Sequence, residues 1–236
     1  MIKLFNENCI YNKEKNETLL YGLFQESLTQ IVIEVFENNV QLLNCELYQL
    51  VICDNRPDFY IKIDGFFTEI HKIDFHFSDN KIHTMENIPL VYPFLNCDLL
   101  LDKKSSAIIT TMCKNYSHRL DEWIQYHLKL GFSGIVIFNN SKNDGIDTNE
   151  SQNIFVTNIS MEQVVEKYKG KVFMVDYPYS PFPNVFWNSI QSVSLYIGVN
   201  EFGEQWSPRR GRSCSIKLWS RSMRRKSLET NAEISH

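Results

Sequence analysis

Short polar side chains follow two apolar runs in the middle of the chain, and their chemistry suits binding of a nucleotide or a sugar. The two runs, 107–112 and 135–138, have the length and β-branched composition of buried strands. The polar residues that follow them are Lys114, Asn115, Asn139, Asn140 and Asp144. An ammonium group attracts phosphate, while amides and carboxylates form hydrogen bonds with a base or a ribose. A solvated lysine and plain turns explain the same residues, because Asn, Asp and Ser stabilise tight turns locally.

An amphipathic helix is predicted to connect the two strands. Apolar residues recur at helical spacing from Leu120 to Leu128, and Gly131 ends the pattern. We expect Asp121 and Glu122 in the first turn, where the helix dipole favours negative charge. The order strand, helix, strand predicts a right-handed crossover between parallel strands. Because ligands bind beyond the carboxyl ends of such strands, both polar loops are expected at one edge of the sheet.

Strands and helices continue to alternate after this unit, so we predict an α/β fold with a mostly parallel sheet and flanking helices. Ser160 and Gln163 have the spacing of a capping box at a helix start. The further elements are expected at 154–158 (strand), 160–169 (helix), 171–175 (strand) and 186–199 (helix with one buried face). Neither polar loop contains the glycine pattern of a dinucleotide-binding or P-loop site.

Residues 1–104 are predicted to be rich in β-strands. The stretch from Leu19 to about Phe94 predicts an antiparallel β region of five or six strands, and the polar residues 1–18 predict an edge strand or a frayed leader. Apolar and polar residues alternate in several runs, and Asp79 and Asn80 mark a hairpin turn. Three histidines in this region, His71, His76 and His83, are candidate ligands of a metal ion. We predict ordinary surface or half-buried histidines, because the spacing does not force three ligands together and lone histidines in amphipathic strands need no ligand role.

Charged residues are distributed unevenly along the chain. Residues 207–236 contain eight Lys or Arg against two Glu, a net charge of +6, so the total of -4 leaves -10 for residues 1–206. An acidic body argues against a general nucleic-acid-binding protein, which needs cationic surface. Six scattered cysteines predict buried free thiols, and no apolar run is long enough for a signal peptide core or a membrane span. We therefore expect a soluble, cytoplasmic protein with a basic, disordered tail.

The middle of the chain resembles a known family. The stretch KNYSHRLDEWIQYHLKLGFSGIVIFNNSKND is similar to the pattern of the family 92 and related family 2-like glycosyltransferases, once called domain of unknown function 23. The match covers residues 107–144, and more weakly Tyr177-Pro178 and the segment QSVSLYIGVNEFGEQW from Gln191. Tyr116 and Asn139 stand where the family usually has Glu and Asp.

The resemblance implies a GT-A fold and transfer of a sugar from a nucleotide sugar to the hydroxyl of a glycan, lipid or protein acceptor. The residues expected to contact the donor are Lys114, Asn115, Glu122, Asn139, Asn140, Asp144 and Gln191. No catalytic residue is assigned. The family is expected to use Mn²⁺ or Mg²⁺ held by a DxD motif, but this chain contains no Asp-x-Asp, so no metal ligand is assigned.

The domains predicted on this basis are a β-rich region (1–104), a partial GT-A domain (105–206) that ends before the DxD motif, and the tail (207–236). Two alternatives remain at this point. One is a nucleotide- or sugar-binding remnant without catalysis. The other is binding to nucleic acid or to a membrane through the basic tail.

Overall fold

The computed structural model describes residues 1–25, 31–49, 58–100, 107–114, 116–141, 159–179 and 187–203. The amino-terminal half contains β1 (Ile2–Leu4), η1 (Asn6–Asn8), β2 (Ile10–Asn12), β3 (Glu17–Phe24), β4 (Ile31–Glu37), β5 (Val40–Leu42), β6 (Cys45–Gln49), β7 (Asp58–Asp64), β8 (Glu69–Phe77), β9 (Ile82–Pro89) and η2 (Pro93–Asn96). The later half contains β10 (Ile108–Cys113), α1 (Ser117–Lys129), β11 (Gly134–Asn139), α2 (Met161–Glu166), β12 (Val172–Asp176) and α3 (Trp187–Gly203).

The amino-terminal half consists of two antiparallel sheets, which confirms the predicted class of this region. Sheet A has the order β1-β3-β7-β6, with β2 also paired to β3, and sheet B has the order β5-β4-β8-β9. The predicted hairpin is β8–β9, where Asn80 adopts a positive φ of 62° in the turn. The described part of the stretch from Leu19 to Phe94 has seven strands, β3 to β9, one more than the prediction allowed, and β1 and β2 precede them. The apolar run that begins at Val40 breaks at Leu43, and its halves join different sheets as β5 and β6.

Sheets A and B pack face to face around an aromatic core. Phe24 and Phe59 of sheet A stack with ring centroids 4.2 Å apart, and Phe75 of sheet B meets each of them edge to face at 6.1 Å. All three side chains are almost completely buried. Offset and edge-to-face contacts are the preferred arrangements of aromatic rings, so this cluster holds the two sheets together.

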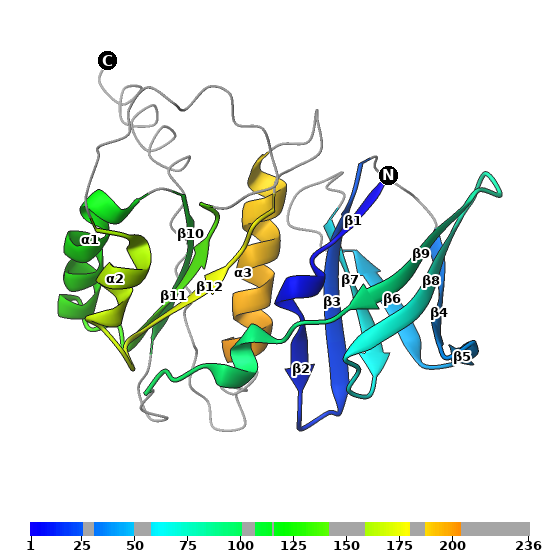
Figure 1. Ribbon diagram of the computed structural model, residues 1–236, viewed down its shortest axis with the longest axis horizontal. Coiled ribbons are helices and arrows are strands. Elements are labelled where there is room, and N and C mark those ends of the chain that lie inside the picture. Colours follow the sequence, from blue (N-terminus) through cyan, green and yellow to red (C-terminus); the bar gives the residue numbers. More distant parts are fainter. Residues whose placement is uncertain are drawn as a thin grey trace, which may run out of the picture.

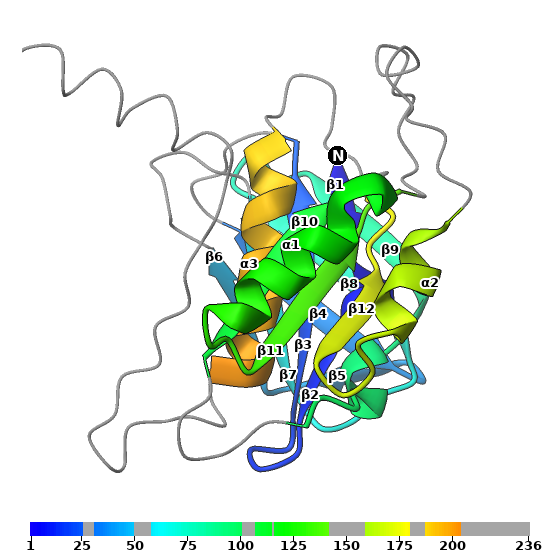
Figure 2. The same ribbon diagram turned by 90° about the vertical axis from the view of Figure 1, so that its left-hand side faces the viewer.

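Sheet C has the order β10-β11-β12, and its strands are parallel, as the alternation of strands and helices predicts. Helices α1 and α2 cover one face, where Ile124 and Val164 pack against Ile137. Figure 2 shows these two helices in front of the sheet. Ser160 and Gln163 form the predicted capping box at the start of α2. The fold is therefore mixed α/β, with a parallel sheet flanked by helices.

The start of α1 differs from the prediction. The helix begins at Ser117, three residues before the apolar pattern that starts at Leu120, so its first turn contains no acidic residue. Asp121 and Glu122 consequently lie in the second turn. Asp121 instead joins the two helices, accepting hydrogen bonds from Lys167 Nζ at 3.2 Å and from the Tyr168 hydroxyl at 3.0 Å. These hydrogen bonds hold the pKa of the Asp121 carboxyl below its ordinary value.

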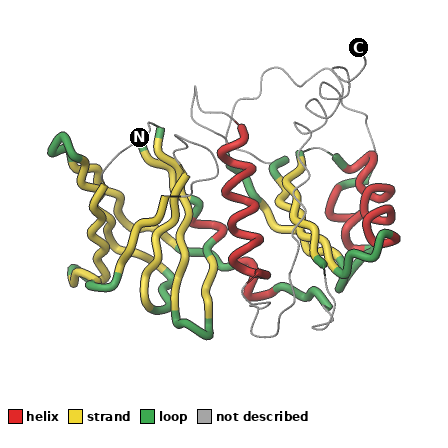
Figure 3. Tube along the Cα trace, turned by 180° about the vertical axis from the view of Figure 1, so that it is seen from behind, coloured by secondary structure: helices red, strands yellow, loops and turns green. Residues whose placement is uncertain are grey.

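Helix α3 lies between sheets A and C and is buried on two sides, although the sequence predicted one buried face. Val193 and Ile197 share a core with Tyr21 of sheet A and Val136 of sheet C. The layers follow the order sheet B, sheet A, α3, sheet C, and then α1 with α2 (Figure 1). Seen from behind, α3 again separates the two groups of strands (Figure 3). A helix that is apolar all round requires such a position.

Several predictions fall outside the described residues: the strand at 154–158, the domain boundary near 104 and the tail at 207–236. Among the described residues, no helix is both long and apolar enough to cross a bilayer. Cys9, Cys45, Cys97 and Cys113 are free thiols, as predicted, but only Cys9 among them is buried and the other three are half-buried. The other two cysteines lie outside the described segments.

Candidate functional site

The candidate site lies at the carboxyl edge of sheet C, where its strands end in register. Cys113 of β10 pairs with Asn139 of β11, which pairs with Asp176 of β12. Side chains alternate along a strand, and Ile137 and Met174 belong to the core beneath α1 and α2. The side chains of Asn139 and Asp176, two positions further on, therefore project from the same face of the sheet. This row is the base of the candidate site.

Asn139 is fixed by neighbours on both sides. Its Oδ1 accepts a hydrogen bond from the Ser141 N–H at 3.1 Å, and its Nδ2 donates one to Glu162 Oε1 at 3.5 Å. Only 2% of Asn139 is exposed, whereas Glu162 and Asp176 are exposed. We call Asn139, Ser141, Glu162 and Asp176 the carboxyl-edge cluster. It presents two carboxylates and an oriented amide beside the ends of two parallel strands.

Glu162 reaches this cluster because α2 begins there. The capping box at Ser160 satisfies helix N–H groups that would otherwise lack a partner, and it places Glu162 in the first turn of the helix. The Ser141 hydroxyl also contacts Met161 Sδ at 3.6 Å, next to Glu162. The end of β11 and the start of α2 are thus attached to each other by side chains.

Asn140 has a different position from Asn139. It is completely buried, and its Nδ2 donates hydrogen bonds to the carbonyl oxygens of Tyr177 at 2.6 Å and Tyr179 at 2.7 Å. Its backbone N–H donates to the Cys113 carbonyl at 2.8 Å. The Asn140 amide is therefore directed at the chain that follows β12, where it shapes the carboxyl edge.

The other predicted contact residues are dispersed. Lys114 follows β10 directly and lies at the carboxyl edge, while Asn115 and Asp144 lie outside the described residues. Glu122 is exposed on α1. It lies on the side of the helix opposite Leu120 and Ile124, whose side chains face the sheet. Gln191 belongs to α3, on the opposite face of sheet C, and is half-buried. The structure thus places Glu122 and Gln191 on opposite sides of the sheet.

Two potentially reactive side chains, one in the last turn of α1 and one at the end of β10, pack into the core. His127 is buried, its Nδ1 lies 2.8 Å from the Trp123 carbonyl oxygen, and its ring lies 4.2 Å from the Trp123 ring. His127 therefore packs at the edge of the core. Burial raises the pKa of the Cys113 thiol to about 12, so the thiolate needed of a nucleophile does not form near neutral pH.

The described residues at the carboxyl edge do not present the ligand set expected of a metal-dependent transferase. Across the described segments, the one group of three possible ligands whose donor atoms lie within 4.8 Å of one another is Glu34, Asp74 and His76 on sheet B. Glu162 and Asp176 are not part of such a group. The described residues at this edge therefore do not fit a Mn²⁺ or Mg²⁺ site, and we derive no step through a metal.

Asp176 and Glu162 were missed by the sequence analysis, although a signal existed for each. Asp176 directly follows a predicted buried strand, as Asn139 does, and applying the strand-end rule to this third strand would have selected it. Glu162 follows a recognisable cap, which predicts a carboxylate at the amino end of a helix. Neither residue falls within the motif of the family resemblance.

Comparison of the chain with models of protein families, with curated proteins and with solved structures found no match.

Proposed function

We propose that this protein binds a nucleotide sugar at the carboxyl edge of sheet C and acts as a glycosyltransferase with a GT-A-like α/β unit. The observation that supports this most is the pairing of Asn139 with Asp176 at the ends of adjacent parallel strands, with Glu162 beside Asn139. Ligands of open parallel sheets bind at this edge. The resemblance of residues 107–144 to the transferase pattern surrounds the same strand ends.

The cluster has the chemistry to hold a sugar or a ribose. Carboxylates accept hydrogen bonds only, so exposed Glu162 and Asp176 suit the hydroxyl groups of a pentose or hexose. Acidic side chains hold ribose hydroxyls in the same way in other parallel-sheet nucleotide sites. In our proposal Asn139 keeps Glu162 oriented, and Asn140 keeps the chain after β12 in place.

The diphosphate of the donor has a cationic and polar environment beside β10. Lys114 follows that strand, and α1 begins three residues later, so the amino end of this helix opens on the same edge. Tyr116, at the N-cap position, makes no side-chain hydrogen bond to the first turn. Helix amino ends attract phosphate through their N–H groups and their dipole.

In the proposed reaction, an acceptor hydroxyl attacks the anomeric carbon of the donor sugar. The bond from that carbon to the diphosphate oxygen breaks, a glycosidic C–O bond forms, and the hydroxyl proton passes to a carboxylate. We assign that role to Asp176, because it is exposed at the edge and carries a carboxylate. Lys114 and the start of α1 would stabilise the negative charge that develops on the departing diphosphate.

A panel of nucleoside diphosphates and their sugar conjugates, tested by thermal shift, would examine binding. A ligand at about 100 times its dissociation constant adds about 2.7 kcal/mol, or about 5–10 °C for a chain of this size. Stabilisation by at least one nucleotide sugar is expected, and no shift with any of them at millimolar concentration would overturn the proposal.

Hydrolysis of the stabilising donor, measured by nucleotide release, separates an enzyme from a binding protein. We expect slow hydrolysis by the wild type that Asp176→Asn abolishes. The matched control is Asp79→Asn, which changes an exposed acid in the β8–β9 turn and should leave hydrolysis unchanged. Donor binding without any hydrolysis would contradict catalysis and leave only the binding part of the proposal.

A further inference from the structure

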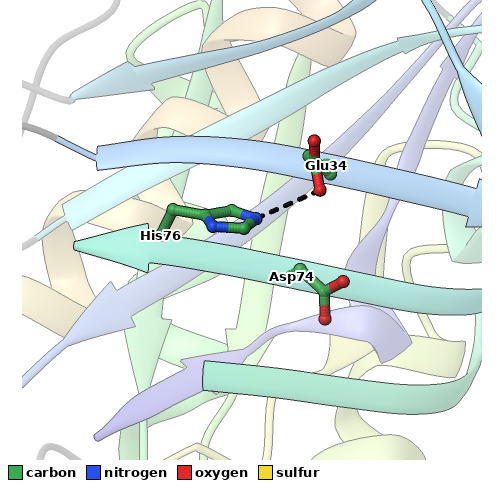
Figure 4. Close-up of side chains that lie close together, drawn as sticks. All are labelled: Glu34, Asp74 and His76. Atoms are coloured by element: carbon green, nitrogen blue, oxygen red, sulfur yellow. Dashed lines mark hydrogen bonds and ion pairs between the residues drawn. The ribbon is translucent and has the colours of Figure 1, made fainter. Parts of the chain in front are cut away.

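Three side chains on the outer face of sheet B converge in the manner of metal ligands. Glu34 of β4 and Asp74 of β8 are direct cross-strand partners, and His76 lies two residues beyond Asp74 on the same strand face. One donor atom of each residue lies within 4.8 Å of those of the other two. Figure 4 shows the imidazole directed at Glu34, with the Asp74 carboxylate beside them.

The arrangement places two carboxylates opposite each other. Like charges at directly paired positions of an antiparallel sheet are destabilising, and Asp74 is only 7% exposed, so solvent screens its charge poorly. A cation located between these groups removes the repulsion. His76 Nε2 and Glu34 Oε2 are 3.1 Å apart. Two ligands of a tetrahedral zinc ion, with bonds of about 2.0–2.1 Å, lie at a similar separation of about 3.3 Å.

Neighbouring side chains orient the two carboxylates. The Thr84 hydroxyl donates a hydrogen bond to Asp74 Oδ1 at 2.7 Å, and Gln41 Nε2 donates one to Glu34 Oε1 at 3.4 Å. The Glu34 oxygen that faces His76 is the other one, Oε2. Hydrogen bonds that leave one carboxylate oxygen directed at the centre are typical of the residues that surround metal ligands.

Lys72 provides the positive charge next to Asp74 in this structure. Its Nζ lies 2.6 Å from Asp74 Oδ2 and also lies over the ring of Phe36, 4.2 Å from the ring centroid. A divalent ion would compete with this ammonium group for Asp74. Lys72 already contacts the Phe36 ring, so its ammonium keeps a cation–π partner when a metal ion replaces it at Asp74.

We propose that Glu34, Asp74 and His76 bind a divalent transition-metal ion, with zinc as the best match to one imidazole and two carboxylates. The ion would fasten β4 to β8. Sheet A and helix α3 lie between this face and sheet C (Figure 1), so the site is separate from the carboxyl-edge cluster. The proposal does not depend on the proposed transferase activity.

Zinc chloride titrated into the full chain by isothermal calorimetry tests the site. We expect saturable binding by the wild type, with affinity at least about tenfold weaker in His76→Ala and in Glu34→Gln. The control is His71→Ala, which removes an exposed histidine from the same strand and should bind zinc like the wild type. The thermal midpoint of each variant without zinc verifies folding, and Glu34→Gln keeps the shape of the side chain.

Lys72→Met offers a second and opposite readout. Removing the competing ammonium should strengthen zinc binding, whereas both ligand variants, His76→Ala and Glu34→Gln, should weaken it. Equal affinities in the wild type, His76→Ala and Glu34→Gln would overturn the proposal, because zinc would then bind elsewhere. Absence of binding by the wild type at millimolar zinc would overturn it as well.

Discussion

Asn140, at the end of β11, holds Tyr177, at the end of β12, by donating a hydrogen bond from its side-chain amide to the tyrosine carbonyl oxygen at 2.6 Å. The same amide nitrogen donates to the Tyr179 carbonyl oxygen at 2.7 Å. Both acceptors are backbone groups in a region without exposed surface, where an unpaired carbonyl is costly. The shape of the carboxyl edge therefore depends on a buried side chain as well as on strand pairing.

Asn140→Ala should lower the free energy of unfolding by about 2–3 kcal/mol, because it leaves two buried carbonyls without their donor. Asn140→Asp should be at least as destabilising, since a carboxylate would face two carbonyl oxygens. Urea unfolding measures both. Asn96→Ala, at an exposed position of η2, is the control and should change stability by less than about 0.5 kcal/mol. Equal effects at the two positions would contradict this role for Asn140.

Gly198 lets α3 approach β10 closely. A Cβ at this position would lie 2.7 Å from both Thr110 Cγ2 and Thr110 Oγ1. Gly198→Ala should therefore destabilise the protein by about 1–3 kcal/mol, although alanine favours helix more than glycine does.

The contact between Gly198 and Thr110 can be tested with a double-mutant cycle measured by urea unfolding. Thr110→Ala removes both atoms that the new methyl group would meet. The double variant should recover about 1 kcal/mol relative to the sum of the single changes. Strict additivity of the two substitutions would show that the contact does not limit packing.

Glu201 should make stability depend on pH. Burial raises the pKa of its carboxyl to about 7, and the positive charge of Lys13 offsets part of this effect. In the unfolded chain the pKa is about 4.3. Between these values the folded state binds more protons than the unfolded state, so stability falls as the pH rises from about 4.5 through 7.

Glu201→Gln should abolish this contribution. At pH 8 the variant should be more stable than the wild type by roughly 3–4 kcal/mol, and at pH 4.5 the two should be nearly equal. Glu166→Gln on the exposed side of α2 is the matched control, expected to follow the wild type at both pH values. Urea unfolding of the three proteins at each pH provides the comparison. A variant no more stable than the wild type at pH 8 would contradict a buried, ionised Glu201.

Local patterns predicted the parallel unit well. The β-branched runs became β10, β11 and β12, and the capping residues at Ser160 and Gln163 marked the start of α2. These features depend on neighbours within a few residues, which the sequence displays directly. The start of α1 was placed too late, because Ser117 and His118 are helical without belonging to the apolar pattern.

Contacts between distant segments could not be predicted in the same way. Asn139 and Asn140 are adjacent and chemically identical, yet one contacts Glu162 and the other holds the chain at Tyr177, 37 residues away. Glu34 and Asp74 meet only because β4 pairs with β8 in one particular register. Helix α3 is buried on two sides because it lies between two sheets, whereas the sequence analysis expected one buried face.

The most direct test of the proposed function is to map donor binding onto the chain by NMR. When a uridine diphosphate sugar is titrated into ¹⁵N-labelled protein, the backbone amide resonances of Asn139, Ser141 and Asp176 should shift, together with those of Cys113 and Lys114. Resonances of β4 and β8 on sheet B should stay in place. Shifts confined to sheet B, or no shifts with any nucleotide sugar at millimolar concentration, would contradict a donor site at the carboxyl edge of sheet C.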